Sequence, residues 1–216
     1  FSDNIGDQLR ASTKKKVLSL FHPINLNLPK IKNKKSAKKD LGLTNSNYVS
    51  FIGLIRKYKG LGVLINSFKY LKNENVKLII AGEFYEPIDK YLNIIKELNL
   101  SEKIIIDNNF LDSKKIRDYM CASEIVIQPY IKASQSGITP VAYFYETPLI
   151  VSNIKGLREI VERDNSGEVF NKTSENLSKV ILNSLKNNNQ ETYRDNIKKS
   201  KSRYTWSRFI QEIEKV

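Results

Sequence analysis

The chain has one cysteine and one histidine among its 216 residues, and both scarcities exclude kinds of site. With Cys121 alone no internal disulfide can form, which indicates a reducing compartment. Cys121 follows Met120 in a helix-like stretch, so we expect it to pack in the core. His22 precedes Pro23 in a stretch typical of a linker, so we expect a structural role for it. We therefore expect no histidine-based triad, no histidine metal cluster and no resident metal or other cofactor.

Long apolar runs are also absent. No run approaches the roughly 18 residues needed to span a bilayer, and no stretch is typical of a signal peptide. The sequence begins with Phe1 rather than methionine, so we expect it to be a piece of a longer protein. These features favour a cytoplasmic location, with the cytoplasmic face of a membrane as a further option.

Acidic residues are few relative to basic ones. The chain has 36 Lys and Arg against 23 Asp and Glu, a net charge of +13, with a pI near 9.6. Such an excess favours phosphate-bearing partners, which include nucleotides, nucleic acid and an anionic membrane surface. A host proteome rich in lysine and asparagine is the alternative explanation.

Apolar residues make up 40% of the chain and fall into alternating strands and helices. Strands are predicted over 15–24, 47–55, 76–82, 103–108, 124–130, 148–152 and 167–171. Helices are predicted over 1–12, 36–43, 60–72, 87–100, 112–123, 137–146 and most of 174–216. Strands that are apolar along their whole length are typical of a parallel sheet covered on both faces. The sequence therefore predicts an α/β fold, a Rossmann-like doubly wound parallel sheet with extra C-terminal helices.

Ligands of such sheets bind outside the carboxyl ends of the strands. The loops to inspect are therefore 53–60, 82–86, 108–112, 130–139 and 152–157. The first loop, GLIRKYKG, lacks the Gly-x-Gly-x-x-Gly pattern of dinucleotide sites, so NAD binding loses most of its support. It offers Arg56, Lys57 and Lys59 instead, whose charges suit a diphosphate. A solvated basic turn is the alternative interpretation.

The segment 130–139 leads into a predicted helix that starts near Gly137. Free backbone N–H groups and the helix dipole favour an anion at such a start. Plain N-capping by Ser136 is the alternative. Together the two loops predict a grip on a diphosphate from two sides, with lysine and arginine charges in place of a metal ion.

Three stretches in this order carry a resemblance: FIGLIRKYKGLGVLI, KLIIAGEFYE and IVIQPYIKASQSGITPVAYFYETPLIVSNIKGLREIV. They resemble the C-terminal, donor-binding domain of GT-B-fold glycosyltransferases, and are most similar to the retaining group called glycosyl transferases group 1. The similarity covers residues 47 to about 171. Each motif is short, whereas their order and spacing are specific.

The resemblance implies a role for each matching position. Lys59 matches the family lysine that contacts the donor diphosphate. The family arginine stands where this chain has Leu54, and we assign its role to Arg56, two residues further on. These two cations are expected to stabilise the leaving phosphate, as the catalytic residues. The other implied donor-binding positions lie at strand ends and the helix start: Gly53, Gly82, Glu83, Phe110, Leu111, Gln135, Ser136, Gly137, Ile138 and Thr139.

The chain departs from the family at two acidic positions. The Glu-x7-Glu pattern, which in the family meets sugar and ribose hydroxyls, falls here on Ala133 and Val141. Gln135 and Ser136 are expected to replace the first contact with neutral hydrogen bonds. Loss of activity is the rival explanation. The glycine that the family carries before Thr-Pro is Glu146 here.

The resemblance also implies an organisation. Residues 1–24 are expected to be a remnant or linker from a missing N-terminal domain, and 25–46 a linker with a short helix. Residues 47–173 would form the nucleotide-sugar-binding domain and 174–216 the C-terminal helices. In relatives the C-terminal helix crosses to the other domain, which would suit a late apolar stripe of Tyr204, Trp206, Phe209 and Ile213.

The implied function is transfer of a sugar from a UDP- or GDP-sugar to a glycan or lipid-linked acceptor, with retention. The isolated chain, which lacks the acceptor domain, would bind nucleotide and transfer nothing. A basic nucleic-acid-binding module is the second hypothesis, although no recognition-helix or stacking-sheet signature supports it and no nucleic-acid partner is expected. A GT-B-fold nucleotide-sugar epimerase is the third. The basic charge also leaves open a peripheral contact with an anionic membrane.

Overall fold

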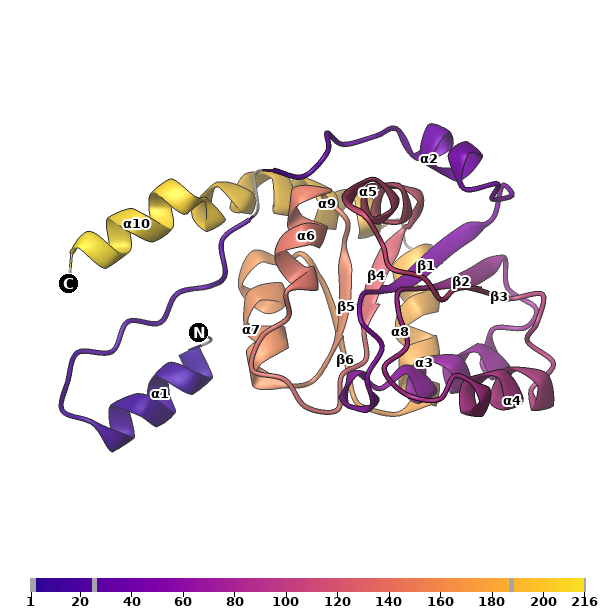
Figure 1. Ribbon diagram of the computed structural model, residues 1–216, viewed down its shortest axis with the longest axis horizontal. Coiled ribbons are helices and arrows are strands. Elements are labelled where there is room, and N and C mark those ends of the chain that lie inside the picture. The colour runs from indigo at the N-terminus through magenta and orange to yellow at the C-terminus, as the bar shows by residue number, and fades with distance from the viewer. Residues whose placement is uncertain (1–2, 25–26, 187–188, 216) are drawn as a thin grey trace.

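Within the described residues of the computed structural model (3–24, 27–186 and 189–215), six parallel strands form one sheet. The strands are β1 (Asn47–Ile52), β2 (Val76–Ala81), β3 (Ile104–Asp107), β4 (Ile125–Gln128), β5 (Leu149–Ser152) and β6 (Gly167–Phe170). Their order is β3-β2-β1-β4-β5-β6 (Figure 1). This order reverses direction between β1 and β4, which makes the doubly wound Rossmann-like arrangement that the sequence predicts.

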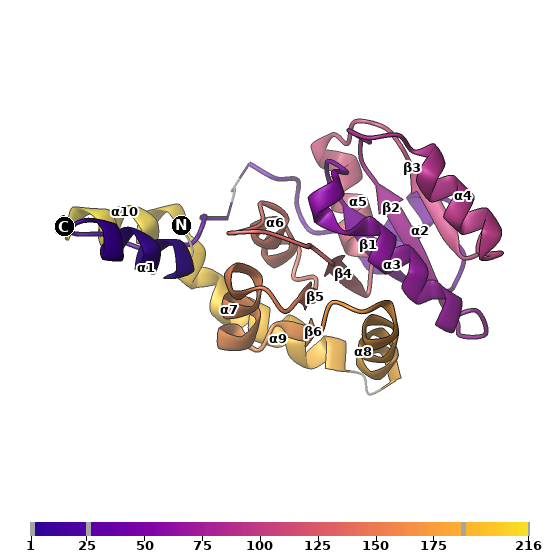
Figure 2. The same cartoon turned by 90° about the horizontal axis from the view of Figure 1, so that it is seen from below.

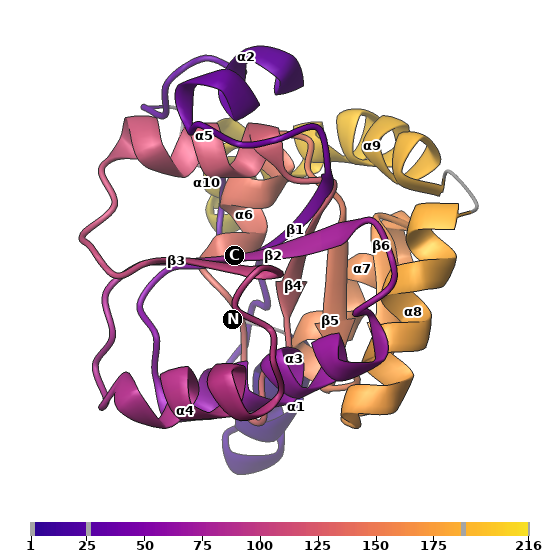
Figure 3. The ribbon, with the colours of Figure 1, turned by 90° about the vertical axis from the view of Figure 1, so that its right-hand side faces the viewer.

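Helices cover both faces of this sheet. In Figure 3, α5 (Ser113–Ala122) and α6 (Ile138–Phe144) lie on one face, and α3 (Leu61–Ser67), α4 (Asp89–Glu97) and α8 (Ser174–Lys186) on the other. Helix α7 (Lys155–Asp164) packs against β5 and β6. The central strands are buried along nearly their whole length, as their apolar sequences predict. Cys121 is buried in this core, as expected.

The strand register shows where the sheet opens at its carboxyl edge. Strand β1 pairs with β2 from Asn47–Val76 to Ile52–Ala81. Its pairing with β4 covers only Val49–Ile125 and Ser50–Val126. Beyond Ser50 the carboxyl ends of β1 and β4 therefore separate, and the loops that follow them frame an opening at the switch point.

The predicted strand at 15–24 is wrong. These residues form an extended strap without strand pairing among the described residues. The strap is held by side-chain packing, with the ring of Phe21 edge-on to Tyr204 at 6.1 Å between centroids. A backbone hydrogen bond from Ile24 N to the carbonyl of Tyr204 at 2.7 Å also holds it. An apolar run predicts burial but does not supply a free sheet edge, and this run packs on a helix and an aromatic ring instead.

Two predicted helices differ in length from the observed ones. The prediction for 60–72 becomes α3 followed by a 3₁₀ turn, η2 (Phe68–Tyr70). The prediction for 36–43 becomes α2 (Lys34–Asp40), after which Gly42 adopts a left-handed φ of 63°, as a helix-terminating glycine does.

The C-terminal region is helical, with α8, α9 (Asn189–Ser200), a 3₁₀ turn η3 (Lys201–Tyr204) and α10 (Trp206–Glu214). Helix α10 and the N-terminal α1 (Asp3–Ser12) both extend away from the sheet on the same side (Figure 2). The late apolar stripe does not dock as a unit on this chain, because Tyr204 is buried whereas Trp206 and Ile213 are 45% and 49% exposed. No residue of α10 is buried.

Candidate functional site

A pocket of about 580 Å³ lies at the carboxyl ends of β1, β2 and β4. Four of the five loops selected from the sequence contribute to it, and the fifth, 152–157, does not. Its lining includes all but one of the predicted site residues: Gly53, Arg56, Lys59, Gly82, Glu83, Phe110, Leu111, Gln135, Ser136, Gly137 and Ile138. Thr139 is the exception. Lys57, the third cation of the first loop, also lies outside this pocket.

The floor of the pocket depends on two glycines. Gly53 and Gly82 have φ values of 106° and 133°, which side chains rarely adopt. A Cβ on Gly82 would lie 2.4 Å from the carbonyl oxygen of Gly53, so the two backbones approach closely only because Gly82 has no side chain. Beside them, Ile55 N donates to the Glu83 carbonyl at 2.8 Å and Tyr85 N donates to the Ile55 carbonyl at 2.9 Å. The loops after β1 and β2 are thus tied into one surface.

Lys59 is the buried cation of the site. Its residue is 8% exposed, and no carboxylate lies within ion-pair distance of it among the described residues. Its Nζ atom lies over the ring of Tyr130, 5.6 Å from the centroid, and 3.4 Å from where a Cβ of Gly53 would stand. Burial, with a further contribution from nearby Arg56, lowers the pKa of Lys59 to about 8. A buried ammonium without a counter-charge is costly, and an anionic ligand would remove that cost.

Arg56 stands at the outer side of the same loop and is exposed. Its guanidinium stacks over the ring of Tyr85 with 4.8 Å between Cζ and the centroid. The stacking restrains the side chain while its donors remain available to a ligand. The first loop therefore presents one buried and one exposed cation to the pocket.

The helix start at 136–139 is partly capped by its own residues. The hydroxyl of Ser136 accepts from Ile138 N at 3.2 Å and contacts the Tyr130 hydroxyl at 3.1 Å. Thr139 N donates to the Ser136 carbonyl at 3.2 Å. The N-capping alternative is therefore realised at Ile138, and the neighbouring residue Gly137 is exposed.

Thr139 does not reach the pocket. It is buried, and its hydroxyl exchanges hydrogen bonds with the side-chain amide of Gln128, at 3.1 and 3.3 Å. The reason is helical phase, because one residue beyond Ile138 the side chain has turned by about 100° toward the sheet.

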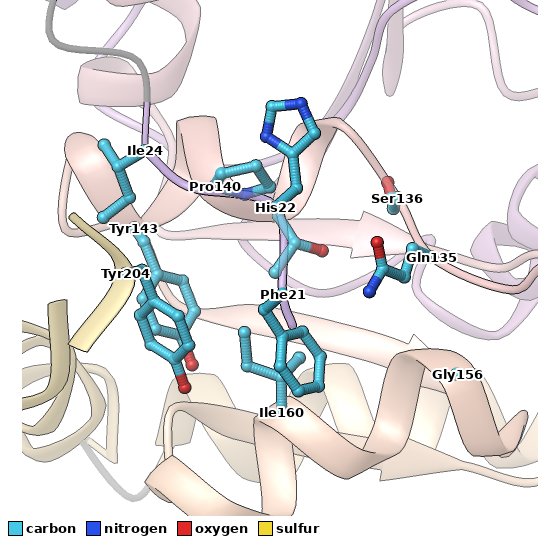
Figure 4. A pocket seen from close by; sticks show the side chains of 11 residues that line it. Phe21, His22, Ile24, Gln135, Ser136, Pro140, Tyr143, Gly156, Ile160 and Tyr204 are labelled. Atoms are coloured by element: carbon cyan, nitrogen blue, oxygen red, sulfur yellow. The ribbon is translucent and has the colours of Figure 1, made fainter. Parts of the chain in front are cut away.

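Gln135 forms part of the wall between the pocket and a much smaller cavity of about 20 Å³ behind it. Figure 4 shows the side chains around this cavity, with Gln135 facing the strap residue Phe21 and the hydroxyls of Tyr143 and Tyr204 close together. The Nε2 atom of Gln135 is buried and has no hydrogen-bond partner in the described part of the chain. Such an orphaned donor is expected to find its partner in a ligand or water.

The outer rim is apolar. Phe110 is 73% exposed, whereas its neighbour Leu111 is buried at the base of the same loop. An aromatic ring held out over a pocket offers a stacking face to a planar group. Asn108 steadies this loop by accepting a hydrogen bond from Phe84 N at 3.1 Å.

The structure also locates the departures from the family pattern. Ala133 and Val141 are partly buried and pack against the core, so no carboxylate occupies either place. Glu146 adopts a left-handed φ of 56°, which explains why a glycine is expected there. Its carboxylate is used away from the pocket, in an ion pair with Lys201 at 2.6 Å.

Sequence reasoning missed two tyrosines of the pocket, Tyr58 and Tyr130. Their rings meet edge-on at 6.0 Å, and Ile131 N donates to the Tyr58 carbonyl at 2.7 Å. Both residues stood in loops already selected, so their aromatic character at a strand end was the available signal.

The described residues offer neither a metal-ligand cluster nor a membrane-spanning helix. No group of three or more His, Cys, Asp or Glu side chains there is arranged to hold a metal ion. In the same part of the chain, no helix has the length and apolar character to cross a bilayer.

Known proteins resemble this chain in sequence and in fold. The capsular polysaccharide biosynthesis glycosyltransferase CapM of Staphylococcus aureus is 26% identical over 199 residues, which cover 84% of this chain and 47% of CapM. The chain spans between 30% and 47% of the length of the curated relatives it matches.

Two solved structures show the same fold. HepE of Anabaena, solved in complex with UDP and glucose, superposes with a TM-score of 0.81 at 18% identity, covering 94% of this chain and 57% of HepE. The C-terminal domain of the group 1 glycosyl transferase LpcC from Francisella tularensis has a TM-score of 0.70 at 19% identity, covering 83% of this chain and 96% of that domain.

The family model of glycosyl transferases group 1 matches residues 33–203. That range contains the whole sheet, the pocket and the loops that line it. The chain therefore belongs to the glycosyl transferases group 1 family.

Proposed function

We propose that this chain is the donor-binding part of a glycosyltransferase, and that the pocket at the carboxyl ends of β1, β2 and β4 binds a nucleotide-diphosphate sugar. The observation that carries the proposal is Lys59, a cation that is 8% exposed and faces no carboxylate among the described residues. A diphosphate supplies the missing negative charge, and burial strengthens that attraction. The related HepE, solved with UDP and glucose, supports a nucleotide of this kind.

Each part of the pocket has a proposed role. Arg56 and Lys59 hold the diphosphate and stabilise the charge that builds on the leaving phosphate as the sugar–phosphate bond breaks. Their charges do the neutralising that a metal ion does elsewhere, so no cofactor is required. Phe110 and Leu111 would contact the nucleobase. Glu83 lines the same pocket. Gln135, which lines the pocket, provides a neutral contact for the sugar where the family has a carboxylate.

The proposed reaction is transfer to a glycan or lipid-linked acceptor with retention at the anomeric carbon. Because the chain spans less than half the length of its curated relatives, we propose that most of the acceptor site lies outside it, so that this chain by itself binds nucleotide without transferring a sugar.

The test is a thermal-shift titration of this chain with UDP, GDP, ADP and a short duplex DNA at two salt concentrations. Ligand at about 100 times its dissociation constant adds about 2.7 kcal/mol, which raises the melting temperature by roughly 5–10 °C for a domain of this size. We expect a shift that is selective among the nucleotides and is absent in Lys59→Met. Lys96→Met, which changes an exposed lysine on α4, is the matched control and keeps the shift.

Two results would contradict the proposal. One is the absence of any nucleotide shift together with a salt-sensitive shift by DNA, which would favour the nucleic-acid-binding hypothesis. The other is a nucleotide shift that Lys59→Met leaves intact, which would place the nucleotide elsewhere.

A further inference from the structure

A second depression adjoins the nucleotide pocket on its outer side. It is open, has a volume of about 590 Å³, and is lined by Arg56, Lys57, Tyr58, Tyr85, Glu86, Ile131 and Lys132. Arg56 and Tyr58 line both hollows, so the two adjoin. A ligand in the outer depression would therefore lie directly beside a ligand in the nucleotide pocket.

The charge of the outer depression is unbalanced. Arg56, Lys57 and Lys132 provide three cations, and none of them is within 4.0 Å of a carboxylate in the described residues. The single carboxylate, Glu86, is paired with Lys90, accepts from the Tyr91 hydroxyl at 2.8 Å and lies within electrostatic range of Lys57. Three cations against one carboxylate leave a net positive charge in the hollow, which favours an anionic ligand.

The same hollow also presents apolar surface. Tyr58, Tyr85 and Ile131 are 44%, 57% and 55% exposed, which is unusual for three large apolar side chains in one place. Arg56 already stacks on Tyr85. Tyrosine rings flanked by cations suit a sugar ring, whose C–H face packs on the aromatic surface while an anionic substituent meets the charges.

The walls are held in place before any ligand binds. The Ile131 N–Tyr58 carbonyl bond joins the loop after β4 to the loop after β1. The Tyr85 N–Ile55 carbonyl bond joins the loop after β2 to the same loop. Binding to a preformed surface avoids the entropic cost of ordering it.

We propose that this outer depression binds the anionic group of the saccharide acceptor, a phosphate or a carboxylate, beside the donor. The inference rests on the proposed function, because only a donor in the inner pocket makes the neighbouring ligand an acceptor. Arg56 would then face both anions, whereas Lys57 and Lys132 serve the acceptor alone. The neutral acceptor of the same size is expected to bind far more weakly.

The experiment is an amide-resolved NMR titration of this chain, saturated with UDP, by glucose 1-phosphate, glucuronic acid and glucose. We expect shifts at residues 57, 58, 131 and 132 with at least one of the two anions and none with glucose. A response to glucose 1-phosphate alone identifies a phosphorylated acceptor, and a response to glucuronic acid alone identifies an acidic sugar. The double variant Lys57→Ala/Lys132→Ala is expected to weaken binding of the anion at least tenfold. The same variant is expected to change the UDP dissociation constant less than twofold.

The control variant is Lys35→Ala/Lys39→Ala, which removes the same charge from another exposed, lysine-rich surface. This control variant is expected to leave the binding of UDP and of the anion unchanged. The inference is overturned if neither anion shifts these residues, if the anion displaces UDP, or if both double variants weaken anion binding equally. Failure of UDP itself to bind would overturn the proposed function, which separates the two outcomes.

Discussion

The Nζ atom of Lys59 lies 5.6 Å from the ring centroid of Tyr130, and this aromatic face is the partner that the structure gives to a buried cation. The interaction offsets only part of the cost of removing an ammonium from water. The residual cost makes the site receptive to an anion and makes its affinity dependent on the protonation of one side chain.

Nucleotide binding is expected to weaken as the pH rises. The pKa of Lys59 is lowered to about 8 by burial, so the ammonium predominates at pH 7 and falls to about a tenth at pH 9. If the diphosphate binds the ammonium, UDP affinity drops about tenfold between these values. Calorimetric titration at pH 7 and pH 9 measures it, and Lys59→Arg, which stays charged, is expected to flatten the profile. An unchanged wild-type affinity at pH 9 would exclude Lys59 as the diphosphate contact.

Removal of the same charge is expected to stabilise the free protein. Because the pKa of Lys59 is lower in the folded chain than its ordinary 10.5, the charging cost is fully present below pH 8 and disappears as the pH rises to 10.5. Lys59→Met should therefore raise the free energy of unfolding at pH 7 by ~1–3 kcal/mol and give little gain above about pH 11. Urea denaturation at the two pH values measures this, and a destabilised variant at pH 7 would contradict it.

Gly82 and Gly137 are expected to respond differently to alanine. A Cβ on Gly82 would collide with the Gly53 carbonyl at a left-handed φ, so Gly82→Ala should cost about 2–4 kcal/mol. A Cβ on Gly137 meets nothing within 4 Å, so Gly137→Ala should leave the free protein's stability nearly unchanged. If phosphate approaches the Gly137 amide, Gly137→Ala nevertheless weakens UDP binding several-fold. Chemical denaturation and UDP titration of both variants separate packing from ligand contact.

Glu146 combines a strained left-handed backbone conformation with an ion pair to Lys201. It ends α6 at φ 56°, where Thr147 N donates to the Ala142 carbonyl at 2.8 Å. Glu146→Gly relieves the strain but loses the Lys201 pair, so its net effect should stay within about 1 kcal/mol. Glu146→Val loses the pair and adds branching at the strained φ, so it should cost about 2 kcal/mol or more. Equal urea midpoints for the two variants would disprove this account.

Asp164 is expected to be the most sensitive carboxylate of the chain. Its side chain is fully buried, accepts from the Tyr143 hydroxyl at 2.9 Å and from the Tyr204 hydroxyl, and pairs with Arg203 at 2.9 Å. Burial raises the pKa of Tyr143 and Tyr204, so both hydroxyls remain donors across the physiological range. Asp164→Ala should cost about 3 kcal/mol, whereas Asp195→Ala, on the exposed side of α9, should cost less than about 0.5 kcal/mol.

Much of the fold follows from the sequence because each central strand is apolar throughout, which admits only a sheet covered on both faces. The carboxyl-edge rule then selects the loops, and Gly53, Lys59, Gly82 and Ser136 do meet in one pocket. What they bind stays a prediction until it is measured.

The failures have physical causes. The strap at 15–24 has strand-like composition, but its partner is Tyr204, distant in sequence, and local pattern carries no information about distant partners. The hydroxyl of Thr139 faces Gln128 instead of the pocket because of one residue of helical rotation beyond Ile138. The pairing of Tyr58 with Tyr130 depends on a backbone bond between two loops, which spacing alone does not reveal.

A backbone hydrogen bond from Ile24 N to the Tyr204 carbonyl joins the strap to the turn before α10. Tyr204 is itself anchored, with its ring edge-on to Tyr143 and its hydroxyl bonded to Asp164, so the order of the strap depends on the attachment of this turn. The two should open together as one cooperative unit, at lower free energy than the sheet. Hydrogen exchange at the Ile24 amide would then report on the attachment of the last helix, far along the chain from where the exchange is observed.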